Sequence, residues 1–176
     1  MSLEEVKLPN YKLRHELWNS ITHGLGALFG IFILIFSLIK IINTGYINGL
    51  DSSNPLSYSS YIIKISSIAI YSISLMITYT ISSIYHALKR NNGKKGLRII
   101  EHDTDYLLIS GTYTPYCLIS LRNVKLYNII PYSGYIILAI VYILIILGIV
   151  FNSININKFK ILSFIMYIAS GWMIIF

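Results

Sequence analysis

NSITHGLGALFGIFILIFSLIKII, residues 19–42, is the stretch of sequence that decides the fold. It is almost continuously apolar after His23, and its one formal charge is Lys40, whose long side chain can reach the headgroup region. About 24 residues in an α-helix rise roughly 36 Å, which exceeds the ~30 Å hydrocarbon core of a bilayer. The stretch therefore predicts a membrane-spanning helix. Gly26 and Gly30 have the small-xxx-small spacing that is typical of close helix packing.

The rest of the 176-residue chain continues this pattern, because 55% of its residues are hydrophobic, 12% are charged and the mean hydropathy is +0.66. An ordinary soluble domain is about half apolar and a quarter charged. More apolar stretches follow at 60–88, 101–121, 127–151 and 161–176, and Pro115 predicts a kink in the second of these. We therefore predict an all-α, polytopic transmembrane helical bundle over 19–176, preceded by a short polar segment at 1–18.

The two ends of the chain carry expectations of their own. Residues 1–18 are polar, and no small-residue cleavage site follows them, so we expect no cleaved leader. The last stretch is still apolar at Phe176, where a final helix normally closes with charges or interfacial aromatics. We therefore expect the sequence to be a fragment of a longer protein. The single cysteine, Cys117, argues against disulfides and cysteine-based metal sites.

The positive charge predicts an orientation. With the N-terminus in the cytoplasm, the cytoplasmic side receives most of the 14 Lys and Arg, and the opposite connector holds Arg122 and Lys125. Cytoplasmic loops of membrane proteins carry an excess of Lys and Arg, so the N-terminus and the segment 1–18 are expected to be cytoplasmic. The formal net charge of +7 is then explained by topology, and no nucleic-acid partner is expected. The inside set is Lys7, Lys12, Arg14, Lys89, Arg90, Lys94, Lys95, Arg98, Lys158 and Lys160.

Polar side chains gather at the cytoplasmic ends of the first three predicted spans. They are Glu16, Asn19, His23, Ser82, His86, Glu101, His102 and Asp105. The first three follow an i, i+3, i+7 spacing, and Ser82 with His86 an i, i+4 spacing, so each set lies on one helix face. Three helices could therefore direct polar faces at one cavity. The alternative is that these are interfacial residues solvated by headgroups, but His23 and His86 lie a turn or more inside the apolar boundary, where a polar side chain needs a partner.

Four motifs in order on successive spans resemble the hemolysin III family, a branch of the progestin and adipoQ receptor superfamily. They are Glu16-x-x-Asn19-x-x-x-His23, Ser82-x-x-x-His86, LRIIEHDTDYLLISGTYTP at 97–115 and Tyr167-x-x-x-Gly171-Trp172. The resemblance implies seven spans, of which five are present, and a zinc ion held by one histidine of span two and two of an H-x-x-x-H motif in span seven. His86 matches the first ligand, and the two further histidines are expected in the missing span.

The resemblance also implies a chemistry. A zinc ion with three imidazole ligands keeps a position for water, whose pKa falls from 15.7 to roughly 7. We expect a zinc-dependent hydrolase of a ceramide-like lipid amide or ester at the cytoplasmic leaflet, with membrane lipids as its partners. Ser82, matching a serine near the zinc-bound water, and Glu101, in place of the family's aspartate, are the catalytic candidates. Glu16, Asn19, His23, His102 and Asp105 would shape the cavity.

Two other functions stay open at the level of sequence. A membrane receptor or regulator of lipid composition would use zinc only to hold the helices together. A cytolytic pore is a weaker reading, because no amphipathic stripe suited to line a wide channel is present. Phosphate-loop, serine-hydrolase elbow and H-E-x-x-H motifs do not occur in the sequence, which excludes those enzyme classes.

Overall fold

The computed structural model describes residues 6–47, 55–122 and 133–173, and the predicted all-α bundle is confirmed. The described residues form helices and no strand. The helices are α1 (Leu13–Ile47), α2 (Pro55–Ala87), α3 (Asn92–Pro115), the π-helical turn η2 (Tyr116–Ser120), α4 (Ser133–Ile154) and α5 (Lys160–Trp172). Parts of two predicted spans, 127–132 and 174–176, lie outside the described residues.

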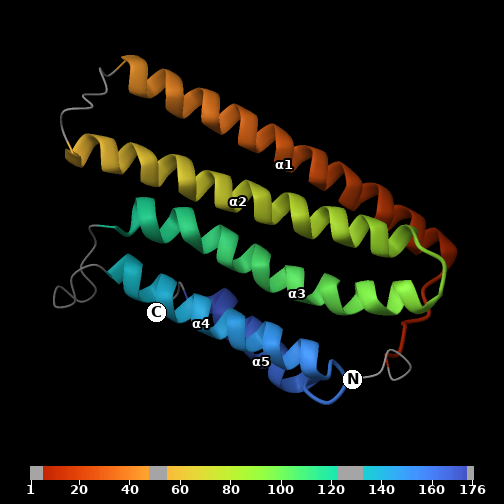
Figure 1. The fold of residues 1–176 in the computed structure, drawn as a ribbon. Coiled ribbons are helices and arrows are strands. Elements are labelled where there is room, and N and C mark those ends of the chain that lie inside the picture. The colour runs from red at the N-terminus through yellow and green to blue at the C-terminus, as the bar shows by residue number, and fades with distance from the viewer. Residues whose placement is uncertain (1–5, 48–54, 123–132, 174–176) are drawn as a thin grey trace.

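The first four helices lie side by side in chain order, and α5 folds back behind α4 (Figure 1). Three segments are long and apolar enough to cross a membrane: Leu13–Thr44, Tyr58–Ala87 and Ser133–Ile154. Helix α5 is apolar but shorter, and α3 carries the charged segment EHDTD at 101–105. Five spans therefore remain a prediction, of which three meet both criteria within the described part of the chain.

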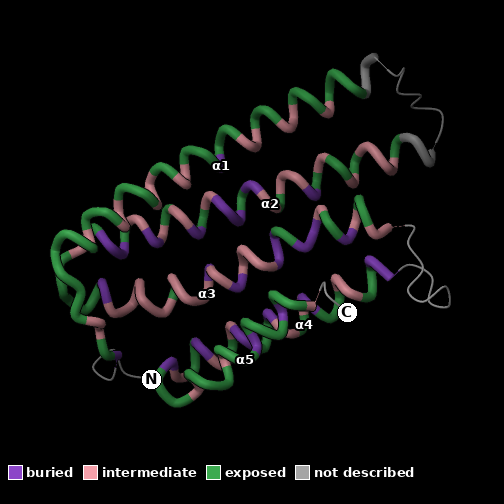
Figure 2. The backbone as a smooth tube through the Cα atoms, turned by 180° about the vertical axis from the view of Figure 1, so that it is seen from behind, coloured by how far each residue is buried: buried purple, intermediate pink, exposed green. Residues whose placement is uncertain are grey.

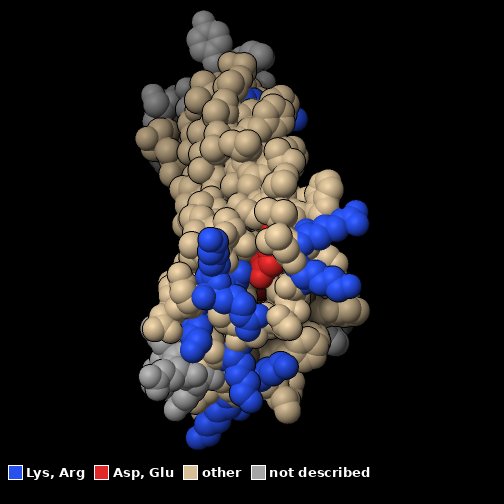
Figure 3. All heavy atoms as spheres, turned by 90° about the vertical axis from the view of Figure 1, so that its right-hand side faces the viewer, with Lys and Arg blue, Asp and Glu red and all other residues tan. Residues whose placement is uncertain are grey.

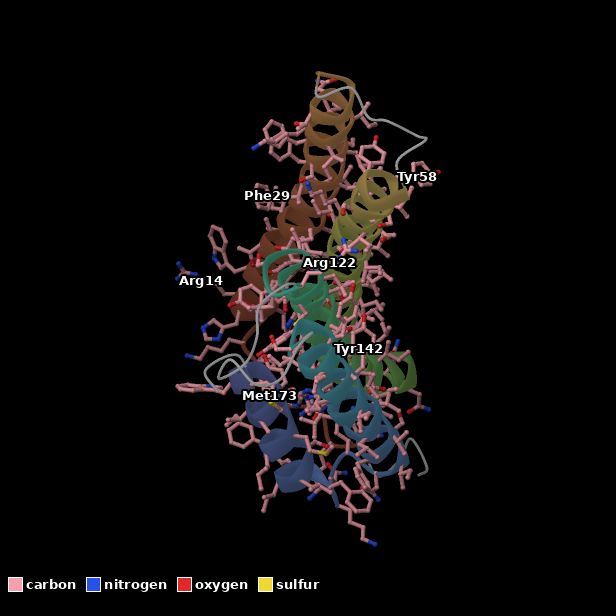
Figure 4. All side chains as sticks on the ribbon, turned by 90° about the vertical axis from the view of Figure 1, so that its left-hand side faces the viewer. Arg14, Phe29, Tyr58, Arg122, Tyr142 and Met173 are labelled. Atoms are coloured by element: carbon pink, nitrogen blue, oxygen red, sulfur yellow. The ribbon has the colours of Figure 1, made fainter. Side chains whose placement is uncertain are left out.

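The outer surface of helix α1 is apolar and suited to contact with lipid. Its backbone packs against α2 alone among the described helices, and only 6% of its most apolar window is buried (Figure 2). Phe29, Phe32 and Phe36 are exposed and stacked along its free side, and Phe29 points away from the bundle in Figure 4. Such a surface would be unfavourable in water but is favourable against acyl chains.

Small residues bring α1 and α2 together, as the glycine spacing predicts. A Cβ on Gly30 would lie 2.8 Å from side-chain atoms of Leu75 and Met76, so the helices approach more closely than a larger residue allows. Ser20 donates to the carbonyl of Ser83 at 3.1 Å, and Ser83 donates back to that of Ser20 at 2.7 Å. These reciprocal bonds fix the register that determines which residues of α1 face the end of α2.

Helix α3 begins at Asn92, earlier than the apolar stretch that predicted it, because a polar cap starts it. Asn91 has extended backbone angles, and its side chain accepts the backbone N–H of Lys94 at 2.8 Å. The short turn between α2 and α3 makes the two helices antiparallel neighbours. At the other end the α-helix stops at Pro115 and continues as η2, which is where the proline predicted an interruption.

The end of the bundle near the α2–α3 turn carries most of the positive charge. Figure 3 shows Lys and Arg side chains gathered on this end around a few acidic atoms. Arg90 holds the N-terminal segment there, since its guanidinium donates to the carbonyls of Leu8 at 3.2 Å and Pro9 at 3.0 Å. The polar residues of α1, α2 and α3 discussed below lie toward this end.

Candidate functional site

His86 lies at the centre of a network of polar side chains from three helices. It occupies the last turn of α2 and is 8% exposed. Its Nδ1 lies 2.7 Å from Oε2 of Glu16 on α1, and its Nε2 lies 3.6 Å from Oε1 of Glu101 on α3. One imidazole is therefore placed between two carboxylates, each of which comes from a different neighbouring helix.

Ser82, one turn before His86, links Glu101 to His23. Its hydroxyl donates to Oε1 of Glu101 at 2.7 Å, and its oxygen lies 2.7 Å from Nδ1 of His23 on α1. A serine has one proton to donate, so once it bonds Glu101 its oxygen accepts from the Nδ1–H of His23. The rings of His23 and His86 are 5.7 Å apart in an edge-on arrangement. The network therefore runs without interruption from α1 through α2 to α3.

The local sequence explains why these side chains meet. Glu16 and His23 are two turns apart on one face of α1, and Ser82 and His86 are one turn apart on α2. Glu101 lies on α3 opposite Ser82 because the turn after Ala87 reverses the chain within a few residues.

The other three predicted site residues lie differently. Asn19 is half-buried on the same side of α1, and its side chain makes no hydrogen bond with the part of the chain that the structure describes. His102 and Asp105 instead line a cavity of about 890 Å³ between α3, the end of α4 and α5. The predicted single cavity is thus two neighbouring regions, the network around His86 and this second cavity, which His102 lines from another side of α3 and Asp105 from a position one turn beyond Glu101.

Lys94 is a member of the network that the sequence reasoning counted only as a topology signal. It is 3% exposed, and its Nζ lies 2.7 Å from Oε1 of Glu16. A lysine in a basic loop is ordinarily solvated, so its charge alone gave no reason to place it inside. The signal that could have found it is Asn91, whose capping role fixes where the first turn of α3 begins.

One residue, His86, is oriented as a metal ligand would be. Histidines that bind metals nearly always donate their other ring N–H to a carboxylate or carbonyl, and Glu16 gives His86 that partner at Nδ1. The Nε2 atom is then left as an electron-pair donor facing the side of Glu101 and Ser82. Residues 6–47, 55–122 and 133–173 contain no group of three His, Cys, Asp or Glu side chains that could hold a metal ion. A complete set would need donors from elsewhere.

Comparison with known proteins agrees with the motifs and the fold. The model of the family described as Haemolysin-III related matches residues 11–176. The Hemolysin-3 homolog of Bacillus subtilis (strain 168) is 32% identical over 165 residues, which cover 94% of this chain and 67% of that protein. Hemolysin-3 of Bacillus cereus is 32% identical over 163 residues, 93% of this chain and 64% of that protein. No solved structure matches the chain.

The chain thus spans about two thirds of the length of these curated relatives. The family match covers all of the helices and every residue of the network around His86. The apolar helices and the family match both indicate an integral membrane protein. The chain belongs to the haemolysin-III-related family of membrane proteins.

Proposed function

We propose that this protein is a zinc-dependent hydrolase of a ceramide-like lipid amide or ester, acting at the cytoplasmic leaflet. The observation that supports the proposal is the geometry at His86, whose Nδ1 is bonded to Glu16 while its Nε2 faces Glu101 and Ser82. An ionisable residue that is paired in this way inside apolar helices is by default a candidate for a functional site. The resemblance to the hemolysin III family, with its histidine in span two, indicates what that site holds.

In this proposal His86 Nε2 is one zinc ligand, and the others come from beyond the described residues. When bound, zinc supplies a Lewis acid that polarises the scissile carbonyl and activates water at neutral pH. Glu101 takes the proton from the attacking water and returns it to the leaving amine or alkoxide. Ser82 holds Oε1 of Glu101 by its hydrogen bond, which leaves Oε2 of that carboxylate to carry the proton. His23 in turn holds Ser82.

The cavity beside this network has the character of an amphiphile site. Its walls include the apolar side chains of Ile156, Ile161 and Phe164, together with His102 and Asp105. A lipid could place its acyl chains along the apolar wall and its amide beside the polar residues of α3. His102 directly follows Glu101 on that helix and Asp105 lies one turn beyond it, so a headgroup held by them would lie close to the proposed base. We propose that lipids are accordingly the substrate and the partners.

The orientation is part of the proposal. The basic side chains that gather at the α2–α3 turn are expected on the cytoplasmic side, and with them the N-terminus (Figure 3). The network around His86 lies toward this end of the bundle. The scissile bond is therefore expected near headgroup depth in the inner leaflet.

Fatty-acid release from a ceramide tests the proposal. The protein encoded by the complete gene is purified from membranes and incubated with a ceramide in mixed micelles, and the products are quantified by mass spectrometry. We expect free fatty acid and sphingoid base in equal amounts, loss of release after a strong zinc chelator, and recovery when zinc is returned. Ceramide that stays intact in the zinc-loaded protein contradicts hydrolysis, and its retention on the protein would then favour a receptor or regulator. Leakage of dye-filled vesicles without hydrolysis would favour a pore.

A further inference from the structure

Lys94 is the single Lys or Arg side chain that the described residues bury, with 3% of its surface exposed. Its ammonium lies 2.7 Å from Oε1 of Glu16, donates to the carbonyl of Leu88 at 3.0 Å, and sits 4.9 Å from the ring centroid of Tyr85. A lysine ammonium has three N–H donors, and here the carboxylate, the carbonyl and the aromatic ring contact it on three sides. The side chain is therefore held in one place.

The backbone at Lys94 is held as firmly as its side chain. Asn91 caps α3 by accepting the backbone N–H of Lys94 at 2.8 Å, and the backbone carbonyl of Asn91 accepts the N–H of Lys95 at 3.2 Å. Helix α3 therefore cannot begin a residue earlier or later without moving the ammonium away from Glu16. By fixing where α3 begins, the Asn91 cap also fixes the position of the Lys94 ammonium.

Glu16 connects Lys94 to His86, because its two oxygens are divided between them. Oε1 accepts from Lys94 and Oε2 is bonded to Nδ1 of His86, both at 2.7 Å. An ammonium at this distance favours the ionised carboxylate, which can only accept hydrogen bonds. The imidazole must then carry a proton on Nδ1, and in its neutral form the electron pair is on Nε2. The carboxylate also cannot rotate without giving up one of its two bonds.

We propose that Lys94 is a positioning residue, which fixes the Nδ1–H tautomer and the direction of Nε2 of His86 through Glu16. The inference rests on the proposed function only in that His86 Nε2 is the atom that binds the metal. A buried ion pair by itself contributes little net stability, because both charges lose their water. Its position beside an imidazole is explained if the ion pair sets the geometry of that imidazole. Outer-shell partners of this kind change metal affinity about 10- to 100-fold.

The tautomer can be measured directly by ¹⁵N NMR of histidine-labelled protein in nanodiscs, because protonated and unprotonated ring nitrogens resonate far apart. The chain has 4 histidines, and His86→Gln assigns the signals of interest. We expect a single Nδ1–H form of His86 in the native protein. Lys94→Met should give a mixture of both tautomers, and its Zn²⁺ affinity, followed on the same signals, should fall about 10- to 100-fold.

Lys95→Met is the matched control, since it removes the same charge from the next residue of α3. Lys95→Met should leave His86 as the single Nδ1–H tautomer. A mixture of tautomers in Lys95→Met would overturn the proposal, as would an unchanged His86 in Lys94→Met.

If Lys94→Met does not fold, the double variant Glu16→Gln with Lys94→Met removes both charges together and should also give mixed tautomers. A pure Nδ1–H form of His86 in the double variant would contradict the positioning role of Lys94. Failure of the proposed function looks different, because then Lys94→Met alters the tautomer while zinc never binds at His86.

Discussion

His86→Ala is expected to lower fatty-acid release from ceramide by about a thousandfold. The substitution removes the imidazole whose Nε2 lies 3.6 Å from Oε1 of Glu101. A catalytic metal lowers a barrier by several kcal/mol, and each ~1.4 kcal/mol is a factor of ten in rate. Losing a ligand of that metal should therefore reduce turnover to near background, measured as initial rates of product formation by the zinc-loaded protein.

His15→Ala supplies the control for this experiment. His15 lies on α1 next to Glu16 in sequence, but it is exposed and belongs to no contact of the network. Its loss should leave the rate within about twofold of native, because exposed substitutions away from such features have small effects. Native-like turnover by His86→Ala in a folded protein would remove the proposed role of this residue.

Gly111→Ala is expected to destabilise the bundle by about 1–3 kcal/mol, although it adds only a methyl group. A Cβ at this position of α3 would lie 1.8 Å from Oγ and 2.7 Å from Cβ of Ser74 on α2. Ser74 is 2% exposed and its hydroxyl is bonded to the carbonyl of Tyr71, so it has no room to withdraw. The helices must then separate, which should appear as a lower midpoint of thermal unfolding in detergent.

Gly96→Ala makes the same chemical change on the same helix with the opposite expectation. No atom lies within 4 Å of a Cβ built there, so the substitution gains helix propensity of up to about 1 kcal/mol and meets no neighbour. A stable Gly111→Ala protein would show that α2 and α3 are not in contact as described. A strongly destabilised Gly96→Ala protein would show that the start of α3 lies elsewhere.

Sequence alone predicted the helical bundle and the meeting of the first three helices. The spacings of Glu16 with His23 and of Ser82 with His86 fix helix faces, and helical geometry turns those faces into contacts. The prediction that these polar side chains meet was well supported, because polar groups inside a membrane need hydrogen-bonding partners. The close approach of α1 and α2 at Gly30 followed from the same kind of spacing.

Other features depended on information that short-range patterns do not carry. The hydropathy pattern places the third span at 101, while the cap at Asn91 starts α3 earlier and brings Lys94 inside. His102 shares a motif with Glu101 in sequence, yet it lines a second cavity because each residue turns about 100° around the helix, whereas Asp105 lines that cavity from the face of α3 that it shares with Glu101, one turn further along. Which face meets α2 and which meets α5 is decided by packing between helices, which a single sequence does not state.

Zinc content is the most direct measurement of the central idea that His86 is the metal-binding group of a polar site shared by three helices. Native protein from the complete gene, His86→Ala and His15→Ala are purified alike without chelator, and zinc per chain is determined by elemental mass spectrometry. We predict close to one zinc per chain in the native and His15→Ala proteins and less than about a tenth of that in His86→Ala, since a ligand is lost. A folded His86→Ala protein that retains its zinc, or a native protein that binds none even when zinc is supplied, would contradict the account.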